Sequence, residues 1–299
     1  MTAHAVPRRS LQQDATIAGV GLFTAQQATL TLRPSAQGLR LRTSPRAVDP
    51  LAPRMVADRP LHPAFHGMAP RSTNLSARGV LVGTVEHLLS ALIGLGITDA
   101  DIELSDTVNG LTETPIFDGS ATPFVDILQA AGVADIPNAT TTPLTIQQPI
   151  TVTDDHGATI IATPRQEPGC HYRYELDYGP GAPIPAQHAE ITLSSHGDAR
   201  RDYVESVAPA RTFSLRAEAE AMQAAGLFAH LSPKDMLVID EHGPIDNPYR
   251  LDHEPARHKL LDLIGDLALI NRPLQLNITA TRAGHALNHE LARALLDHA

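Results

Sequence analysis

A short pattern that occurs twice is the feature that most restricts how this chain can fold. His87 is followed by four residues and then 92–94 (LIG), and His258 by four residues and then 263–265 (LIG). Each copy lies in a predicted helix, which runs into a strand, a Gly-x-Ala step and a second helix. This repeated order predicts two related α+β halves, with one histidine from each half at a site between them.

Hydrophobic periodicity predicts the individual elements. We expect helices at 83–94, 119–131, 216–225, 254–269 and 289–296, and strands at 28–33, 100–104, 144–153, 159–163, 172–178, 236–240 and 274–281. The proline-rich segment 45–70 predicts a loop or an insert. The polar, proline-bounded segment 134–143 (ADIPNATTTP) predicts a linker. This linker would divide the chain into two α+β domains, 1–136 and 137–299.

Composition excludes several classes of protein. Hydrophobic residues make up 42% of the 299 residues, so the chain can build a packed core. The formal net charge of -10 disfavours general binding to nucleic acid, although a local basic pocket can still hold a small anion. Cys170 is the only cysteine, which excludes an intrachain disulfide and a thiolate zinc site.

Membrane and export signals are also missing from the sequence. Residues 1–13 lack the apolar stretch of a secretory signal, and no segment approaches the roughly 18 apolar residues of a membrane span. We therefore expect a cytoplasmic protein that is not an integral membrane protein. The sequence does not fix the oligomeric state, and a monomer is the default expectation.

The second copy of the pattern places a histidine and a carboxylate on one helical face. His258 and Asp262 are four residues apart, which brings their Cβ atoms to about 5–6 Å in a helix. That spacing suits two ligands of one metal ion, and Asp266 continues the same face one turn later. The alternative is an ordinary ion pair on a surface helix, which this segment taken alone favours.

The first copy supplies the missing members of a metal site. Glu86 and His87 open the first long helix, where a histidine by itself could simply pack or cap. Together with His258 and Asp262, His87 gives the two imidazoles and one carboxylate that hold a catalytic zinc with an open fourth position. Glu86 would be placed to take a proton from water. A site of this composition can also take Fe(II) or Co(II).

Three further residues are candidates for the chemistry. Thr212 could donate a hydroxyl hydrogen bond to an oxyanion, or it is a buried threonine in a turn. His285, at a strand-to-helix turn, could be a general acid, or it is an ordinary loop histidine. Asp266 would be the carboxylate that keeps His285 protonated.

The chain resembles the zinc-dependent UDP-3-O-acyl-N-acetylglucosamine deacetylases of lipid A biosynthesis. The matching motifs keep the family order and cover nearly the whole chain. They are 19–22 (GVGL), 84–88 (TVEHL), 117–121 (FDGSA), 210–213 (ARTF), 257–262 (RHKLLD), 264–267 (IGDL) and 284–288 (GHALN). The resemblance implies two similar sheet-plus-helix domains, each with an insert, and zinc held by His87, His258 and Asp262. It also implies Glu86 as general base and His285 as general acid.

The same resemblance assigns the remaining roles. Thr212 would assist the oxyanion, Asp266 would orient His285, and Lys259 and Phe213 would contact the UDP-linked acylated amino sugar. Apolar residues of the insert would line a passage for the acyl chain: Leu215, Met222, Leu227 and Phe228. The chain departs from the family pattern at Phe23, at Gly83 and at 228–234 (FAHLSPK), where the customary Gly-Gly-Ser is missing. These departures bear on acyl-chain preference and on activity.

The expected reaction is hydrolysis of the substrate acetamide to UDP-3-O-acyl-glucosamine and acetate. One alternative is a deacetylase of another amidated nucleotide-sugar or glycolipid. An alternative of a different class is a non-catalytic relative that binds a UDP-sugar or a lipid. The presence of both Glu86 and His285 disfavours binding alone, because binding requires neither a base nor an acid.

Overall fold

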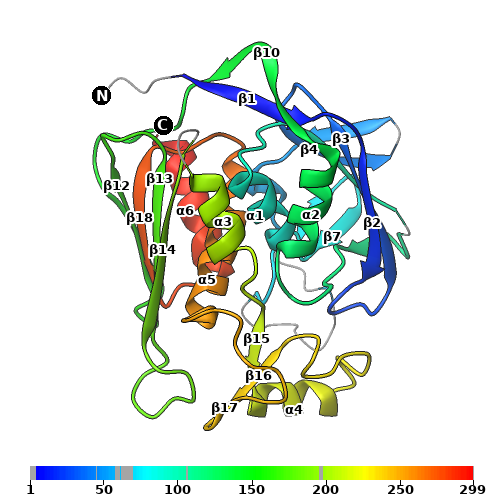
Figure 1. Ribbon diagram of the computed structural model, residues 1–299, viewed down its shortest axis with the longest axis vertical. Coiled ribbons are helices and arrows are strands. Elements are labelled where there is room, and N and C mark those ends of the chain that lie inside the picture. Colours follow the sequence, from blue (N-terminus) through cyan, green and yellow to red (C-terminus); the bar gives the residue numbers. More distant parts are fainter. Residues whose placement is uncertain are drawn as a thin grey trace.

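Two five-stranded sheets form the outer layers of the molecule (Figure 1). The computed structural model describes residues 5–44, 46–57, 61, 70–105, 107–194 and 198–298. The first sheet has the order β2 (Ala15–Val20), β3 (Gln27–Pro34), β8 (Ala100–Leu104), β4 (Leu39–Ser44) and β5 (Ala47–Pro50). In β3 the alternation seen in the sequence places Ala28, Leu30 and Leu32 in the core. The strands expected at 28–33 and 100–104 are confirmed.

The second sheet repeats the strand order of the first. It consists of β11 (Ile150–Thr153), β12 (Thr159–Pro164), β18 (Leu276–Thr281), β13 (Cys170–Leu176) and β14 (Gln187–Leu193). In both sheets the third and fourth strands of the order run parallel, and the other neighbours run antiparallel. The mixed α+β architecture is confirmed. An origin by duplication stays a prediction, with which this shared order agrees.

The helices pack between the two sheets (Figure 1). They are α1 (Glu86–Gly94), α2 (Thr122–Ala131), α3 (Ala199–Ser206), α5 (Glu254–Leu267) and α6 (His285–Asp297). Helices α1 and α5 contact each other in the middle of the molecule. Their backbones come so close that a Cβ on Gly265 would lie 2.0 Å from the carbonyl oxygen of Glu86. This approach brings the first turn of α1 beside α5.

The predicted linker is a strand. Residues 134–143 fall largely within β10 (Val133–Thr141), which pairs antiparallel with β1 (Val6–Leu11) across one end of both halves. The segment predicted as a linker is ordered in a sheet, because pairing with the distant β1 outweighs a polar, proline-containing composition. The boundary after residue 136 lies inside this strand, and the division into 1–136 and 137–299 stays a prediction.

Two three-stranded sheets complete the fold, and the second of them lies at the lower end of the molecule in Figure 1. A three-stranded sheet contains β6 (Leu75–Ala77), β7 (Val80–Gly83) and β9 (Leu111–Glu113). Another contains β15 (Phe213–Leu215), β16 (Leu237–Asp240) and β17 (Gly243–Pro244), beside α4 (Arg216–Ala224). Of the proline-rich segment 45–70, the structure describes β5 and a short 3-10 helix, Pro53–Met55, whereas 45, 58–60 and 62–69 lie outside the described residues. None of the helices described is long and apolar enough to cross a membrane.

Candidate active site

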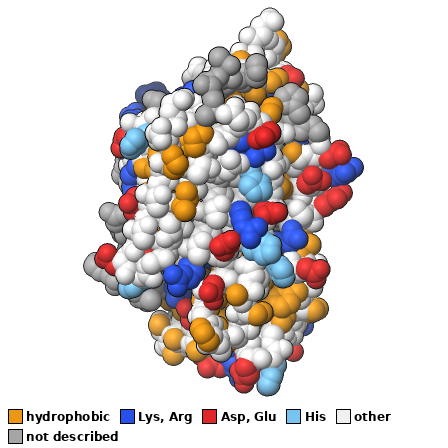
Figure 2. Space-filling model, turned by 90° about the vertical axis from the view of Figure 1, so that its left-hand side faces the viewer, with side chains coloured by type: hydrophobic (Ala, Val, Ile, Leu, Met, Phe, Trp, Pro, Cys, Tyr) orange, Lys and Arg blue, Asp and Glu red, His pale blue; other side chains and the backbone are white. Residues whose placement is uncertain are grey.

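A cavity of about 300 Å³ opens beside the first turn of α1 and the N-terminal half of α5. We call it the histidine cavity. Every residue that the sequence predicts for the site lines it, except Asp266, which lies behind His285. In Figure 2, histidines and side chains of both charge signs gather above the lower part of the molecule, where hydrophobic side chains are frequent. Residues far apart in the sequence thus meet at one polar site.

Two histidines converge on one oxygen of Asp262. His87 Nε2 lies 3.6 Å from Asp262 Oδ1, and His258 Nε2 lies 3.4 Å from the same oxygen. All three side chains are buried, and their ligand atoms lie within 4.8 Å of one another. The edge of a tetrahedron with bonds of about 2.0–2.1 Å is roughly 3.4 Å. The spacing therefore fits three ligands of a single metal ion.

The protonation states also fit a metal site. His258 Nδ1 donates a hydrogen bond to the carbonyl oxygen of Ala210 (3.1 Å), which leaves the lone pair of a neutral ring on Nε2. Burial lowers the pKa of His87 to about 3 and also lowers the pKa of His258, so both rings are neutral near pH 7. Neutral imidazole is the form that binds a metal.

Asp262 contributes a buried oxygen that lacks a hydrogen bond. Its Oδ2 accepts from Lys259 Nζ (2.9 Å), while Oδ1 is buried and has no hydrogen-bond partner among the described residues. Burial favours protonation of Asp262, but the neighbouring cationic groups, His258 when protonated and Lys259, outweigh it and hold the pKa below its usual range. A buried, unpaired carboxylate oxygen is costly unless a cation fills the place that it faces.

Glu86 is a buried carboxyl group placed beside these ligands. It is the first residue of α1, and its Oε2 accepts a hydrogen bond from the backbone N–H of Thr73 (3.0 Å). Burial is the main cause that raises the pKa of Glu86 to about 8. A carboxyl group with a pKa near neutrality can take up and return a proton, as general acid–base catalysis requires.

His285 has the opposite character. It is the first residue of α6, a helix that begins four residues before the start predicted at 289. Its Nδ1 lies 2.8 Å from Asp266 Oδ2, and Asn288 Nδ2 donates to the same oxygen (2.8 Å). Burial lowers the pKa of His285, but the charge of Asp266 outweighs this effect and raises the pKa to about 9. His285 is therefore protonated near pH 7 and can donate a proton.

Thr73 links Glu86 to Asp266, the partner of His285, and sequence reasoning missed it. Its N–H binds Glu86, and its hydroxyl donates to Asp266 Oδ1 and lies 2.8 Å from Nε2 of His289. Thr73 follows a proline-rich segment without periodicity, so no pattern in one sequence marks it. His289 lies one turn after His285 on the same helix, and this spacing could have indicated it.

Thr212, Phe213 and Lys259 also line this cavity. The N–H of Thr212 donates to the carbonyl oxygen of Gly119 (2.7 Å), and its own carbonyl accepts from Leu237 N–H (3.1 Å). These two bonds fix the backbone of Thr212 at the edge of β16. The Lys259 ammonium lies 5.9 Å from the centre of the Phe213 ring and is bound to Asp262. The catalytic and substrate roles of these residues stay predictions.

A buried ion pair fixes the segment that carries Thr212. Arg211 and Glu254 are both almost fully buried, and Arg211 Nε donates to Glu254 Oε1 (2.8 Å). Arg211 also donates to Asn247 and to the carbonyl oxygen of Pro248. Glu254 is the first residue of α5. The ion pair therefore connects this helix to the segment before β15, in which the carbonyl oxygen of Ala210 accepts the hydrogen bond from His258.

The apolar residues predicted for an acyl passage separate into two groups. Met222, Leu227 and Phe228 belong to a cluster with Leu22 and Phe23 of the first half, and the rings of Phe23 and Phe228 are 5.7 Å apart. Leu215 packs against the main core instead. The first group lies beside the histidine cavity, since Leu22 lines that cavity as well. The lining of an acyl passage by these residues stays a prediction.

Known proteins match the chain along nearly its whole length. The family model described as LpxC, UDP-3-O-acyl N-acetylglycosamine deacetylase, matches residues 8–297. The UDP-3-O-acyl-N-acetylglucosamine deacetylase of Myxococcus xanthus is 36% identical, over 97% of this chain and 86% of its own length. The enzymes of that name from Citrifermentans bemidjiense and a Psychrobacter species are 35% and 36% identical, over 97% and 96% of this chain and 88% and 91% of their own lengths. The chain belongs to the UDP-3-O-acyl-N-acetylglucosamine deacetylase family.

Proposed function

We propose that this protein is a zinc-dependent deacetylase that hydrolyses the acetamide of UDP-3-O-acyl-N-acetylglucosamine, a step of lipid A biosynthesis. The products are UDP-3-O-acyl-glucosamine and acetate. The observation that carries the proposal is the convergence of His87 and His258 on the unpaired Oδ1 of Asp262, beside Glu86 and His285 in one cavity. This arrangement combines a metal-ligand set with a base and an acid.

The three ligands would hold one zinc ion, and Glu86 and His285 line the same cavity without belonging to this ligand group. Bound zinc supplies a Lewis acid that polarises the acetyl carbonyl and lowers the pKa of water. Two neutral imidazoles and one carboxylate are the donor set of catalytic zinc sites, which keep a position open for substrate or water.

The residues around the ligands divide the proton transfers between them. Glu86 takes the proton of the attacking water in its ionised form, which the charge of a bound cation would favour against the burial that raises its pKa to about 8. His285 enters protonated, held in that state by Asp266, and donates its proton to the departing sugar amine. The hydroxyl of Thr212, which lines the same cavity, assists the oxyanion of the tetrahedral intermediate.

The cavity wall suits a substrate with an anionic part and an apolar part. Lys259 and Arg71 line the cavity and supply positive charge, although Arg71 is shared with Glu218 (3.2 Å). The adjoining cluster around Met222 and Phe228 supplies apolar surface. Binding of a remote acyl chain can help hold the acetamide in place, so the acylated sugar should react much faster than plain UDP-N-acetylglucosamine.

Acetate release from the UDP-linked acylated substrate tests the proposal directly. Metal content and activity are measured on the same samples of wild type, Glu86→Gln and His87→Ala. We expect about one zinc per chain in wild type and in Glu86→Gln, with a rate at least ~10²-fold lower in Glu86→Gln. His87→Ala should lose zinc and activity together.

Three results would contradict the assignment. Stoichiometric zinc in His87→Ala would remove this residue from the ligand set. Near-normal turnover by Glu86→Gln would remove Glu86 from the mechanism. Binding of the substrate by wild type without acetate release would indicate a non-catalytic relative. The cytoplasmic location and the monomeric state stay predictions of the sequence.

A further inference from the structure

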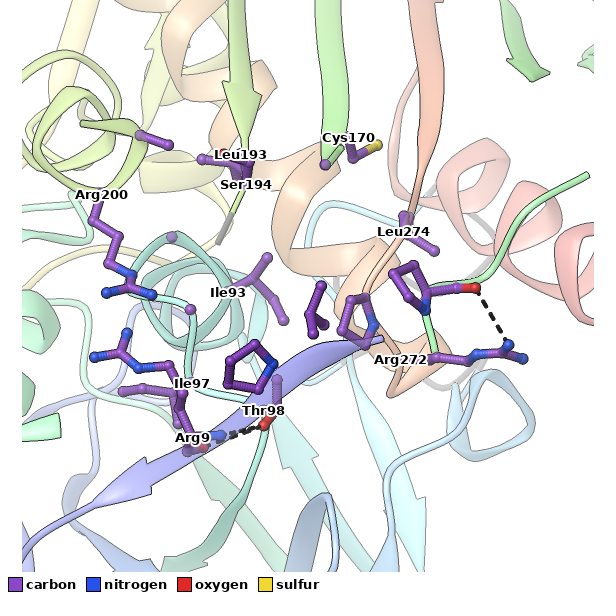
Figure 3. Close-up of a pocket in the computed structure, with 18 of the residues that line it drawn as sticks. Arg9, Ile93, Ile97, Thr98, Cys170, Leu193, Ser194, Arg200, Arg272 and Leu274 are labelled. Carbon is purple, nitrogen blue, oxygen red and sulfur yellow. Dashed lines mark hydrogen bonds between the residues drawn. The ribbon is translucent and has the colours of Figure 1, made fainter. Parts of the chain in front are cut away.

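A second cavity lies at the other end of the central helix pair. Its volume is about 310 Å³, and residues at the ends of α1 and of the 3-10 turn after α5 line it, among them Ile93, Gly96, Ile97 and Asn271. We call it the arginine cavity (Figure 3). Helix α1 has nine residues and is therefore about 13 Å long, which separates this cavity from Glu86 and His87 at the opposite end.

The interior of the arginine cavity is apolar and comes from both halves of the chain. The first half supplies Leu39, Ile93 and Ile97, and the second half supplies Leu193 and Leu274. Figure 3 shows Ile93 between the arginines at one end and Leu274 towards the other. An opening of this size lies at the lower end of the range for small-molecule sites, roughly 300–1,000 Å³, and apolar walls are typical of them.

Two guanidinium groups meet at one end of this cavity, where Asp135 also lines the wall, forms an ion pair with Arg9 and attracts Arg200 more weakly. A Cβ on Gly96 would lie 3.1 Å from Arg200 Nε and 3.4 Å from Arg9 Nη1, so both groups converge on the same point (Figure 3). Arg9 is satisfied, since it donates to Asp135 Oδ1 (3.0 Å) and to the Leu95 carbonyl (3.0 Å). Arg200 Nε is buried and has no hydrogen-bond partner among the described residues.

Burial and a neighbouring cation both act on Arg200. Arg200 lies in the first turn of α3, where Asp198 at the N-cap pairs with Arg201 (3.2 Å) and Asp202 is a second acidic residue. These carboxylates offset the positive end of the helix dipole, so the positive charge of the site comes from the arginines. Burial, followed by the charge of Arg9, lowers the pKa of Arg200, which shows that the cation is held at a cost.

A shallower cavity continues from the same arginines. It has a volume of about 490 Å³, shares Arg9 and Arg200 with the arginine cavity, and is lined in addition by Arg201. No acidic residue lines it among the residues described. Arg272, at the far end of the arginine cavity in Figure 3, donates to the backbone carbonyls of Thr142 and Pro143. Among the arginines that line the arginine cavity, the buried donor without a partner in the described part of the chain is Arg200 Nε.

We propose that the arginine cavity binds an amphipathic anion, with an oxyanion head between Arg9 and Arg200 and a single acyl chain over the apolar wall. A planar guanidinium matches carboxylate and phosphate oxygens, and these charge-assisted hydrogen bonds are among the stronger ones in proteins. Because Arg9 is already paired with Asp135, a head at this place would neutralise mainly the charge of Arg200, whose Nε has no partner among the described residues. The ligand would contact both halves of the chain at a distance from the histidine cavity.

Calorimetric titration with decanoate tests this site. Decanol supplies the chain without the charge, and acetate supplies the charge without the chain. We expect decanoate to bind at least about tenfold more tightly than either probe. Across hexanoate, octanoate and decanoate, each added CH₂ should strengthen binding by up to about fourfold until the apolar wall is covered.

Two neighbouring arginines give a matched pair of variants. Arg200→Gln should weaken decanoate binding at least about tenfold, as expected for loss of a charge-assisted hydrogen bond. Arg201→Gln should change it less than threefold, because Arg201 is well exposed and does not line the arginine cavity. Without ligand, the melting temperature of Arg200→Gln should equal or exceed that of wild type, since the substitution removes a repulsion and an unsatisfied donor.

The outcomes are decisive in both directions. Equal binding of decanoate and decanol would show that the arginines do not select an anion and would overturn the proposal. Unchanged decanoate binding in Arg200→Gln would place the fatty acid elsewhere, including the histidine cavity, and would also overturn it. Because Arg200 has no part in the proposed reaction, unchanged acetate release by Arg200→Gln would separate this site from the deacetylase function.

Discussion

Helices α1 and α5 occupy corresponding places in the two halves, yet only α5 carries a carboxylate one turn and two turns after its histidine. Along the chain, α1 lies between β4 and β8, and α5 lies between β13 and β18. In each sheet these two strands are the parallel neighbours, and each helix contains the LIG pattern. One turn after His258 comes Asp262 and two turns after it comes Asp266, whereas the same steps from His87 lead to Ala91 and Leu95. The shared scaffold therefore determines where the two histidines meet. The residues that differ between the two helices, Asp262 and Asp266 in α5, supply further groups of the predicted site.

The glycines that end the repeated pattern show a second difference. A Cβ on Gly265 would collide with the backbone of Glu86, at 2.0 Å from its carbonyl oxygen. A Cβ on Gly94 would collide with the ring of Tyr203, with its nearest atoms at 2.3 Å. Both glycines allow close packing, but only Gly265 is pressed against the turn that holds two site residues.

The largest effect is expected from removing the carboxylate that only α5 carries. Asp262→Asn should lower zinc affinity by more than about 100-fold, since changes to residues that merely support a ligand already cost 10–100-fold. Acetate release should fall with it. Elemental analysis after dialysis and an activity assay on the same sample measure both quantities.

Asp101 is the matched control in the first half. Its side chain is as buried as that of Asp262 (5% exposed each), but it is paired with Arg40 and Arg42. Asp101→Asn should keep zinc and lower the free energy of unfolding by about 1–3 kcal/mol. Zinc loss in both variants would mean that metal binding depends on general stability and not on a ligand at Asp262.

The next effect compares the two glycines. Gly265→Ala should lower the free energy of unfolding by about 3 kcal/mol or more, because a helix backbone cannot move aside as a side chain can. Gly94→Ala should cost about 1–2 kcal/mol, since the Tyr203 ring and α3 can shift. Chemical denaturation measures both, and only Gly265→Ala should also reduce zinc binding.

Gly284→Ala serves as the reference for this pair. No atom lies within 4 Å of a Cβ at Gly284, and its φ of −122° suits any residue. Its stability should stay within about 0.5 kcal/mol of wild type. Equal costs for Gly94→Ala and Gly265→Ala would show that the two helix contacts are equally rigid and would remove this difference between the halves.

A smaller effect should follow from the second carboxylate of α5. Asp266 raises the pKa of His285 to about 9, and His285 must be protonated to act as an acid. Activity should therefore fall as the pH rises through this value. Asp266→Asn removes the charge that favours the protonated ring, so the alkaline limb of kcat/KM should move down by at least about one pH unit.

Asn288→Ala is the control for the pH profile. It removes a hydrogen bond to Asp266 Oδ2 but leaves the carboxylate in place, so the alkaline limb should stay close to that of wild type. The pH–rate profiles of the three proteins measure the limb. An unchanged limb in Asp266→Asn would mean that His285 is not the group that titrates there.

Sequence reasoning succeeded where a pattern is local and failed where distant pairing decides. The helix predicted at 254–269 corresponds to α5 and the 3-10 turn that follows it, because an apolar stripe at helical spacing marks it. The segment of β10 was predicted as a linker. Its pairing could not be read from the local pattern, because its partner β1 lies more than a hundred residues away in the sequence. Helix α3 was not predicted, since only Ala199 and Tyr203 of its eight residues are buried.

The candidate site shows the same division. The spacing of His258 and Asp262 is visible within one helix, and the repeated pattern indicated His87 as their partner. Thr73 could not be found in this way, because its role depends on two carboxylates that the fold brings to it from α1 and α5. Lys259 was predicted as a substrate contact, but its bond to Asp262 becomes apparent only in three dimensions.

The smallest effect is expected at Cys170, the first residue of β13, whose counterpart is the first residue of the corresponding strand β4. Leu39 begins β4 and Cys170 begins β13, both are almost fully buried, and both line the arginine cavity. Leu39→Ala should cost about 2–5 kcal/mol, whereas Cys170→Ala removes a single heavy atom and should cost about 1 kcal/mol. Burial raises the pKa of the Cys170 thiol to about 12, so the reactive thiolate is scarce in the folded protein near pH 8. A thiol reagent should then modify native Cys170 only as fast as the protein unfolds, and denaturant should accelerate the reaction in step with unfolding. Rapid modification of the native protein would show that the second sheet opens locally at Cys170 without global unfolding.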